Sequence, residues 1–262
     1  MANERTVDQT TCESNPAADR RFAGVARLYG EDAFEAFGRA TVVVIGLGGV
    51  GSWAAEALAR SAVGHLVLVD FDHIALSNVN RQLHAVEGNF GKAKVLAMAE
   101  RLQAINPTIQ LTIHDAFAEL GNLEYIIPKG AFVLDACDEV STKVALANFC
   151  QRHQIPLTMC GGAGGKLDPT RIQIADLAKT IQDPLLAKIR AQLRKNHSFS
   201  RDLKKPMGIQ AVYSSEARRG IASGGLECSG YGSGVTVTAA FGFAAASACL
   251  KQITNSSSQS FC

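Results

Sequence analysis

The chain has 262 residues, of which 47% are hydrophobic and 19% are charged, and its formal net charge is +2. This composition excludes a disordered or fibrous protein. A chain of this length buries enough surface to fold without disulfides or a structural metal, so one large α/β domain or two small ones would be stable.

Short apolar runs alternate with longer amphipathic stretches along most of the chain. The runs are rich in β-branched residues and Leu and nearly continuous, as in parallel strands buried on both faces. They predict strands over 40–46, 65–70, 110–115, 131–136, 155–160 and 170–176, and helices over 52–61, 91–105, 141–153 and 184–195. Strands that alternate with helices indicate right-handed crossovers and an α/β, doubly wound, mostly parallel sheet.

The remaining segments carry weaker signals. Residues 1–20 and 255–262 are polar and predict flexible tails, and 196–233 is rich in Ser, Gly, Lys and Arg and predicts loops. Residues 234–250 are uncharged over seventeen positions, the lower limit for a membrane span. We favour a buried core or dimer-interface helix there, and membrane contact is the less favoured interpretation.

The N-terminal sequence and the cysteine spacing indicate the cellular compartment of the protein. The first 21 residues are polar and lack the apolar core of a signal peptide. Seven cysteines form no CxxC pair, which argues against a zinc ribbon and a disulfide framework. We therefore expect a cytoplasmic protein, with membrane association through 234–250 as the alternative.

A glycine-rich turn follows the first predicted strand. Gly46, Gly48, Gly49 and Gly51 lie between that strand and the helix over 52–61, where backbone N–H groups bind phosphate. Asp70 closes the second strand, the position of an acid that receives ribose hydroxyls. These features predict a nucleotide site, and taken alone they also fit a nicotinamide-binding module.

Charged residues after the second strand argue against a dehydrogenase. The sequence reads DFDHIALSNVNRQ over 70–82, GKAK over 91–94 and LDACD over 134–138. Cations and acids beside a nucleotide suit cleavage between the α and β phosphates, because Arg and Lys neutralise developing charge and Asp binds Mg²⁺.

At these residues, over about 30–176, the sequence resembles the ubiquitin-activating-enzyme-like adenylyltransferase superfamily. The resemblance implies a Rossmann-like domain that binds ATP and Mg²⁺. It also implies roles for individual residues: Gly46, Gly48, Gly49 and Gly51 hold phosphate, Asp70 binds ribose, Asn78 lies by the phosphates, Arg81 and Lys94 stabilise the transition state, and Asp138 is both catalytic and the metal ligand. Lys92 competes with Lys94 for the lysine role. The expected homodimer would need an arginine in trans, but Gly24 stands where many members have it, which leaves Arg21 or Arg27.

The second half of the sequence resembles one family within this superfamily. CGGAGGKLDPT over 160–170, RFAGVARLYG over 21–30 and YSSE over 213–216 resemble the tRNA threonylcarbamoyladenosine dehydratases, one family of that superfamily. The resemblance implies ATP-dependent cyclisation of threonylcarbamoyladenosine next to the anticodon, through an acyl adenylate on the threonyl carboxylate. It implies one adenylating domain over 21–254, with a basic helix and loop region over 184–233 and a C-terminal extension.

A basic segment is consistent with an RNA partner. Residues 188–219 hold nine Lys or Arg and two acids, a local charge of +7. Such a surface binds phosphates with strong salt dependence. The predicted tRNA contacts are Lys188, Arg190, Arg194, Lys195, Arg201, Lys204 and Lys205.

Several alternatives stay open. An activator of a ubiquitin-like sulfur-carrier protein shares the chemistry, but such enzymes commonly carry the two CxxC pairs that are missing here, so a sulfur-transfer partner is the second choice. Cys228 matches a loop cysteine of the family and is a candidate acyl acceptor, although intramolecular ring closure makes a thioester redundant. His84 is a candidate substrate contact, with a structural role favoured.

Overall fold

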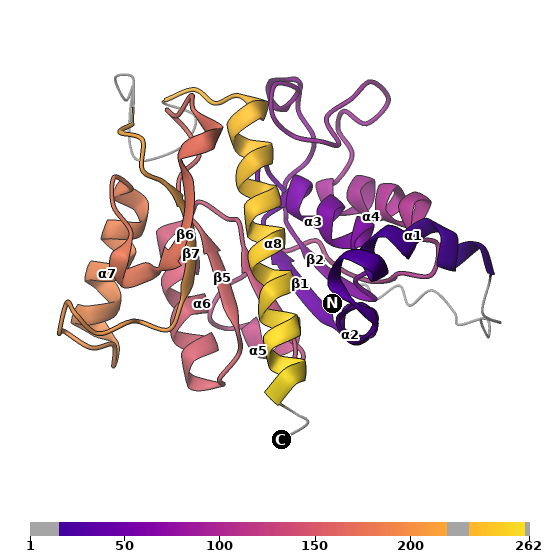
Figure 1. The fold of residues 1–262 in the computed structure, drawn as a ribbon. Coiled ribbons are helices and arrows are strands. Elements are labelled where there is room, and N and C mark those ends of the chain that lie inside the picture. The colour runs from indigo at the N-terminus through magenta and orange to yellow at the C-terminus, as the bar shows by residue number, and fades with distance from the viewer. Residues whose placement is uncertain (1–15, 219–230, 260–262) are drawn as a thin grey trace.

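A seven-stranded sheet runs through the middle of the protein (Figure 1). The computed structural model describes residues 16–218 and 231–259. The strand order is β3-β2-β1-β4-β5-β7-β6, and every described strand pair is parallel except β6 with β7. The strands are β1 Thr41–Ile45, β2 His65–Val69, β3 Gln110–His114, β4 Phe132–Asp135, β5 Leu157–Cys160, β6 Ile172–Asp176 and β7 Gln210–Ser214.

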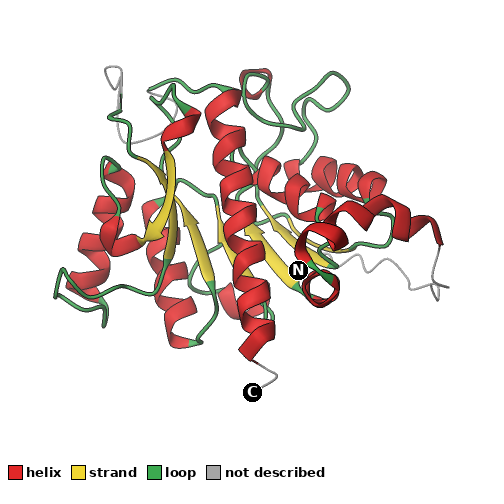
Figure 2. Ribbon diagram, in the orientation of Figure 1, coloured by secondary structure: helices red, strands yellow, loops and turns green. Residues whose placement is uncertain are grey.

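Helices cover both faces of this sheet, as Figure 2 shows. On β1, Val42 and Val44 join one buried cluster, whereas Val43 and Ile45 join a second, because successive strand residues point to opposite faces. The first cluster includes residues of α2 Glu31–Arg39, α3 Gly51–Arg60, α4 Lys94–Ile105 and α8 Val235–Gln259. The second includes residues of α5 Leu123–Ile126, α6 Val140–Arg152 and α7 Pro184–Asn196. The doubly wound α/β prediction is confirmed.

The remaining elements of the described chain are an N-terminal helix and three short 3₁₀ turns. Helix α1 spans Pro16–Tyr29 and precedes α2. The 3₁₀ turns are η1 Leu76–Asn78, η2 Pro169–Arg171 and η3 Leu177–Lys179. The first of them lies in the loop after β2, in the charged block that the sequence singles out.

Helix α8 is a core helix. Phe241, Ala245 and Cys249 are fully buried on it, against α3 and the sheet. A Cβ on Gly242 would lie 2.6 Å from the Val50 carbonyl oxygen, so only glycine allows the two helices to pack this closely. Within residues 16–218 and 231–259, no helix combines the length and apolar character needed to cross a bilayer. Burial confirms the core-helix interpretation of 234–250.

Most predicted elements agree with the structure to within one to three residues, and three differences matter. Strand β7 lies inside 196–233, where only loops were predicted, and β6 is antiparallel to it. Helix α1 begins at Pro16, inside the predicted tail 1–20, and α8 continues to Gln259, past the predicted tail start at 255. The described parts of the two predicted tails, 16–20 and 255–259, are thus helical, since such short helix ends carry no apolar stripe of their own, and the rest of both tails lies outside the described residues.

Candidate active site

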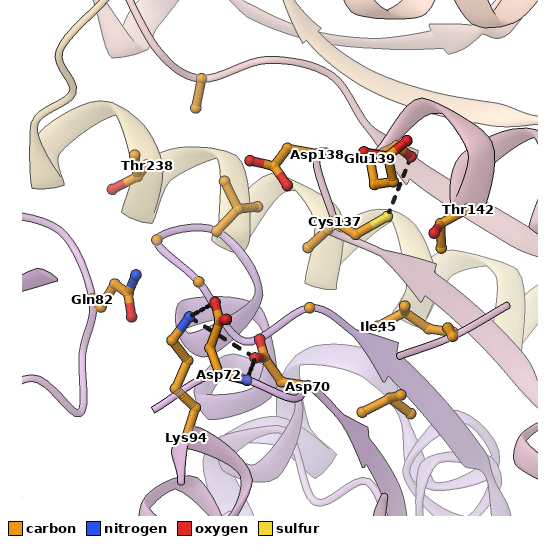
Figure 3. A pocket seen from close by; sticks show the side chains of 18 of the residues that line it. Ile45, Asp70, Asp72, Gln82, Lys94, Cys137, Asp138, Glu139, Thr142 and Thr238 are labelled. Carbon is orange, nitrogen blue, oxygen red and sulfur yellow. Dashed lines mark hydrogen bonds and ion pairs between the residues drawn. The ribbon is translucent and has the colours of Figure 1, made fainter. Parts of the chain in front are cut away.

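A cleft of about 280 Å³ opens at the carboxyl ends of the central strands. Loops after β1, β2, β4 and β5 line it, which is where doubly wound sheets bind their ligands. The predicted site residues that line it are Gly46, Gly48, Gly49, Asp70, Asn78, Arg81, Lys94 and Asp138. Residues separated by nearly one hundred positions therefore meet at one edge of the sheet (Figure 3).

The glycine turn is shaped by two close approaches. Gly46 has φ +85°, and a Cβ on it would lie 2.9 Å from the Cys137 nitrogen. A Cβ on Gly51, at the start of α3, would lie 1.7 Å from the Gly46 carbonyl oxygen. Both positions therefore require glycine. The turn brings the N-terminus of α3 to the cleft, where its free N–H groups favour a phosphate.

Two acids and a lysine form a tight group beside the glycine turn (Figure 3). Lys94 Nζ lies 2.6 Å from Asp72 Oδ2 and 3.9 Å from Asp70 Oδ1. Asp70 Oδ2 accepts a 2.6 Å hydrogen bond from Leu47 N. Burial raises the pKa of Asp70, while the charge of Lys94 and the backbone donors oppose that rise. Lys94 thus favours an ionised Asp70 that can accept hydrogen bonds from hydroxyl groups.

Lys92 and Lys94 have different surroundings. Lys92 forms an ion pair with the exposed Glu100 on the first turns of α4 and does not line the cleft. Lys94 is 5% exposed and does line it. This placement favours Lys94 over Lys92 as the lysine that faces the nucleotide.

Arg81 and Asn78 lie on the loop that contains η1. The buried Asn78 accepts a hydrogen bond at Oδ1 from Ala75 N and so holds the turn. Trp53 Nε1 donates to the Arg81 carbonyl oxygen at 3.0 Å, and a Cβ on Gly49 would lie 3.0 Å from Arg81 Cγ. The backbone of Arg81 is therefore fixed against the glycine turn.

Asp138 lies on the turn that follows β4. Its carboxylate is exposed and takes part in no ion pair or hydrogen bond with another residue of the described chain. Behind it, the fully buried Lys143 Nζ lies 3.0 Å from Asp135 Oδ2 and donates to the Cys160 carbonyl oxygen at 2.8 Å. Asp135 Oδ1 accepts from Cys137 N at 3.1 Å. One ion pair thus connects the turns that follow β4 and β5.

His84 is 2% exposed, and neither ring nitrogen has a hydrogen-bond partner among the described residues. Burial, with a smaller contribution from Lys94, lowers the pKa of His84 to about 4, so the ring is neutral near pH 7. His84 does not line the cleft, which favours the structural role for it.

The described thiols are poor nucleophiles. Burial raises the pKa of Cys160 and of Cys249 to about 12, and that of Cys150 likewise. Burial and the neighbouring Asp135 also raise the pKa of Cys137, the one described thiol that lines the cleft. A thiolate mechanism would therefore depend on another cysteine, and Cys228 lies outside the described residues.

Two aromatic residues of the cleft are not among the predicted site residues. The rings of Phe71 and Phe117 stack with their centroids 3.4 Å apart, and both are about half exposed at the edge of the cleft. Phe71 directly follows Asp70, so its place at the cleft could have been predicted from the sequence. Phe117 follows β3, and only the pairing of β3 with β2 brings it there.

The predicted RNA contacts are spread along α7 and beyond. Lys188 lies near Glu139, which lines the cleft. The hydrogen bonds from Ser141 lower the pKa of Glu139, and the charge of Lys188 makes a smaller contribution in the same direction. Arg190 Nη1 donates to Thr180 Oγ1 and to the Leu177 carbonyl oxygen, and two guanidinium nitrogens of Arg194 are buried. The exposed residues farther along are Lys195, Arg201, Lys204 and Lys205.

These exposed residues lie away from the cleft. Helix α7 begins beside Gly162, because the Asp183 carboxylate that caps it accepts from Gly162 N at 2.9 Å. Thirteen helical residues then lead about 20 Å away. The 201–206 segment precedes β7, which is parallel to β5, so it lies at the amino-terminal edge of the sheet. The structure therefore does not bring the whole basic segment to the nucleotide site.

Comparison with known proteins extends over nearly the whole chain. The ThiF family model matches residues 20–261. The chain is 45% identical over 250 residues to the tRNA threonylcarbamoyladenosine dehydratase of Escherichia coli K12, which covers 89% of this chain and 93% of that protein. It is 35% identical over 133 residues to the molybdopterin-synthase adenylyltransferase of the same species, which covers 51% and 53%.

A solved structure agrees with the sequence match. The crystal structure of the Escherichia coli tRNA N6-threonylcarbamoyladenosine dehydratase in complex with ATP superimposes with a TM-score of 0.87 at 44% identity. The match covers 95% of this chain and 99% of that one. Fold and sequence therefore point to the same group of proteins.

Proposed function

Since this chain belongs to the ThiF family, we propose that it is an ATP-dependent tRNA threonylcarbamoyladenosine dehydratase. The observation that carries this function is the 45% identity to such an enzyme over 93% of its length. The threonyl carboxylate attacks the α-phosphorus of ATP and expels pyrophosphate. An atom of the carbamoyl group then attacks the acyl carbon, loses its proton and expels AMP. The net change in the nucleoside is the loss of one water.

ATP occupies the cleft with its phosphates at the glycine turn. Gly46, Gly48, Gly49 and Gly51 give the backbone room to approach them, and the N-terminus of α3 supplies positive potential. Asp70 accepts the ribose hydroxyls, and Asn78 lies beside the phosphates. Arg81 and Lys94 neutralise the charge that develops as pyrophosphate leaves.

Magnesium fits the donors at Asp138. The described residues contain no group of three or more metal-ligating side chains, so an all-protein cage is not available there. Mg²⁺ is usually held by one or two carboxylates together with substrate phosphates and water, and the exposed, unpaired Asp138 offers such a carboxylate. When bound, the ion would offset negative charge on the phosphates.

The aromatic pair supports a site for the adenine ring. Phe71 and Phe117 present apolar faces to the cleft next to Asp70. We expect Phe117→Ala to raise the KM for ATP about tenfold or more and to leave kcat nearly unchanged, because base stacking is worth about 1–3 kcal/mol and holds the substrate and the transition state alike. Steady-state ATP–pyrophosphate exchange measures both constants.

Tyr125→Ala is the control for the aromatic pair. It removes an exposed ring that does not line the cleft and should leave both constants unchanged. A Phe117→Ala enzyme with an unchanged KM for ATP would place the adenine elsewhere.

The decisive experiment measures the product. Incubation of the protein with threonylcarbamoyladenosine-containing tRNA and ATP, followed by nucleoside mass analysis, should show the loss of one water from the modified nucleoside. An activator of a sulfur-carrier protein would leave the nucleoside unchanged and would show pyrophosphate exchange that does not respond to tRNA. The weaker likeness to the molybdopterin-synthase adenylyltransferase, limited to about half of each chain, makes that alternative the second choice.

The exposed basic residues at the end of α7 and beyond it would contact the tRNA away from its target nucleoside. Lys195→Glu, Lys204→Glu and Lys205→Glu together should weaken tRNA binding and flatten its salt dependence. Each lost phosphate contact removes about 0.7–0.9 from the slope of log affinity against log salt. ATP affinity should hardly change, since the three residues lie at the far edge of the sheet. Titrations of labelled tRNA at several salt concentrations measure this slope, and an unchanged slope would reject this surface.

A homodimer is supported by an exposed apolar surface beside Arg81. Leu76, Val79, Val235 and Phe243 are each 41–72% exposed. They lie together, because Asn80 Nδ2 donates to the Ser233 carbonyl oxygen and the ring of Phe243 contacts that of Trp53. A second copy would cover this surface and could supply Arg21 or Arg27 from its exposed α1.

We expect Phe243→Glu to shift the protein to a monomer and to reduce its activity. Sedimentation velocity gives the oligomeric state, and Leu203→Glu, which alters an exposed Leu at the opposite edge of the sheet, is the control. A Phe243→Glu protein that sediments like the wild type would contradict this interface.

A further inference from the structure

Arg218 lies where the chain leaves β7, next to the glycine segment of the cleft. A Cβ on Gly162 would lie 2.7 Å from Arg218 Nη2, and Gly162 lines the cleft. Glycine at 162 therefore makes the space that the guanidinium occupies. The nucleotide turn follows β1, whereas Gly162 follows β5, two strands along the sheet and about 10 Å away. Arg218 thus approaches the cleft two strands along the sheet from the glycine turn.

The charge of Arg218 is not neutralised within the described chain. Its Nε and Nη1 are buried without a hydrogen-bond partner, and the guanidinium forms none of the ion pairs found among residues 16–218 and 231–259. The guanidinium carbon lies 4.5 Å from the centre of the Tyr231 ring, which gives partial compensation. Within the described residues this half-buried, always protonated group therefore lacks a partner anion, which is unfavourable.

The nearby carboxylates are engaged elsewhere. Asp183 accepts from Gly162 N and from Leu186 N, the second bond being the cap of α7. Glu216 Oε2 accepts from Leu167 N and Asp168 N. Lys166 Nζ donates to three carbonyl oxygens. Burial is the main cause that lowers the pKa of Lys166, and the positive charge of Arg218 acts in the same direction. Asp183 and Glu216 are therefore already hydrogen-bonded to backbone N–H groups, and neither forms an ion pair with Arg218.

We propose that Arg218, supported by the Tyr231 ring, binds an oxyanion of the RNA substrate beside Gly162. The planar guanidinium fork suits either a carboxylate or a phosphate, so the oxyanion is the threonyl carboxylate or a backbone phosphate of the anticodon loop. This inference rests on the proposed function. It adds a substrate contact on the side of the cleft that the nucleotide leaves open.

The experiment measures binding of two tRNAs, one carrying the threonylcarbamoyl group and one lacking it, to the wild type and to Arg218→Gln. If Arg218 binds the carboxylate, the variant binds the modified tRNA about 10- to 100-fold more weakly and binds the unmodified tRNA as the wild type does. If it binds a phosphate, the affinity for both tRNAs falls by the same factor. Similar affinities of both proteins for both tRNAs would overturn the proposal.

Three further measurements separate a specific oxyanion contact of Arg218 from general charge attraction and from a structural role. Arg171→Gln is the control, because it removes one positive charge from an exposed arginine that donates to the Ser215 carbonyl oxygen. If Arg171→Gln loses as much tRNA affinity as Arg218→Gln, the contribution of Arg218 is general charge attraction. The Arg218→Gln protein should keep the wild-type thermal midpoint or exceed it, because it loses an unpaired buried charge; a clearly lower midpoint would make Arg218 structural. Its affinity for ATP should be unchanged.

The two proposals fail in different ways. If the wild-type protein does not dehydrate the modified nucleoside, the proposed function is wrong, whatever the affinities are. If it does so and Arg218→Gln binds and dehydrates the modified tRNA equally well, only the role of Arg218 is wrong.

Discussion

Arg81→Ala and Lys94→Ala are each expected to lower the turnover of ATP–pyrophosphate exchange by about 10²–10³, far more than they weaken ATP binding. Both side chains line the cleft beside the glycine turn. Positive charge there matters most when negative charge moves onto the departing pyrophosphate. Removal of either cation therefore affects the transition state more than the ground state.

Lys94→Ala should have a second effect that Arg81→Ala lacks. Lys94 opposes the burial that raises the pKa of Asp70, and Asp72 is close to the same carboxylate. Without Lys94, the pKa of Asp70 rises further, so a higher pH is needed to ionise it. The KM for ATP of this variant should therefore fall as the pH increases, whereas that of Arg81→Ala should follow the wild type.

Steady-state exchange kinetics across a pH series measure both effects. Lys92→Ala is the matched control, since Lys92 is two residues away on the same segment but pairs with Glu100 outside the cleft. Full turnover in both Arg81→Ala and Lys94→Ala would show that adenylation does not use this site.

Lys143→Met is expected to lower the free energy of unfolding by about 3–5 kcal/mol. Lys143 and Asp135 are both fully buried, with Nζ and Oδ2 3.0 Å apart. Met fills most of the same volume but leaves the Asp135 carboxylate without its counter-ion, and an uncompensated buried charge is strongly destabilising. The Cys160 carbonyl oxygen also loses its donor.

The consequences extend to the cleft, because this pair connects the turns that follow β4 and β5. Asp138 lies three residues beyond Asp135, and Gly161 and Gly162 directly follow Cys160. Adenylation by Lys143→Met should therefore fall even at a temperature where the variant is folded. Urea unfolding followed by circular dichroism gives the stability, and exchange kinetics give the activity.

A double variant tests the electrostatic cause. Asp135→Asn combined with Lys143→Met removes both charges and should be clearly more stable than Lys143→Met alone, since no single charge remains buried. If the two variants are equally unstable, packing and not charge accounts for the loss.

Local sequence was sufficient to predict the residues that the structure brings together around the glycine turn. The glycine turn, Asp70, Asn78, Arg81 and Lys94 are close to one another along the chain, and each follows a recognisable strand or starts a helix. The carboxyl ends of parallel strands meet at one edge of a sheet, so Asp138 could also be placed from the end of its own strand. The doubly wound fold followed from the same alternation of apolar runs and amphipathic helices.

The sequence by itself thus determined the fold class, the nucleotide cleft and the family, because short-range patterns encode strands, glycine turns and the acids that end strands. Only the tertiary structure decided what depends on pairing between distant segments. It placed β7 between β5 and β6, brought Phe117 against Phe71, and directed Arg218 to Gly162. It also moved Lys204 and Lys205 to the far edge of the sheet, because the direction of β7 is set by its pairing with β5 and no local pattern reports it.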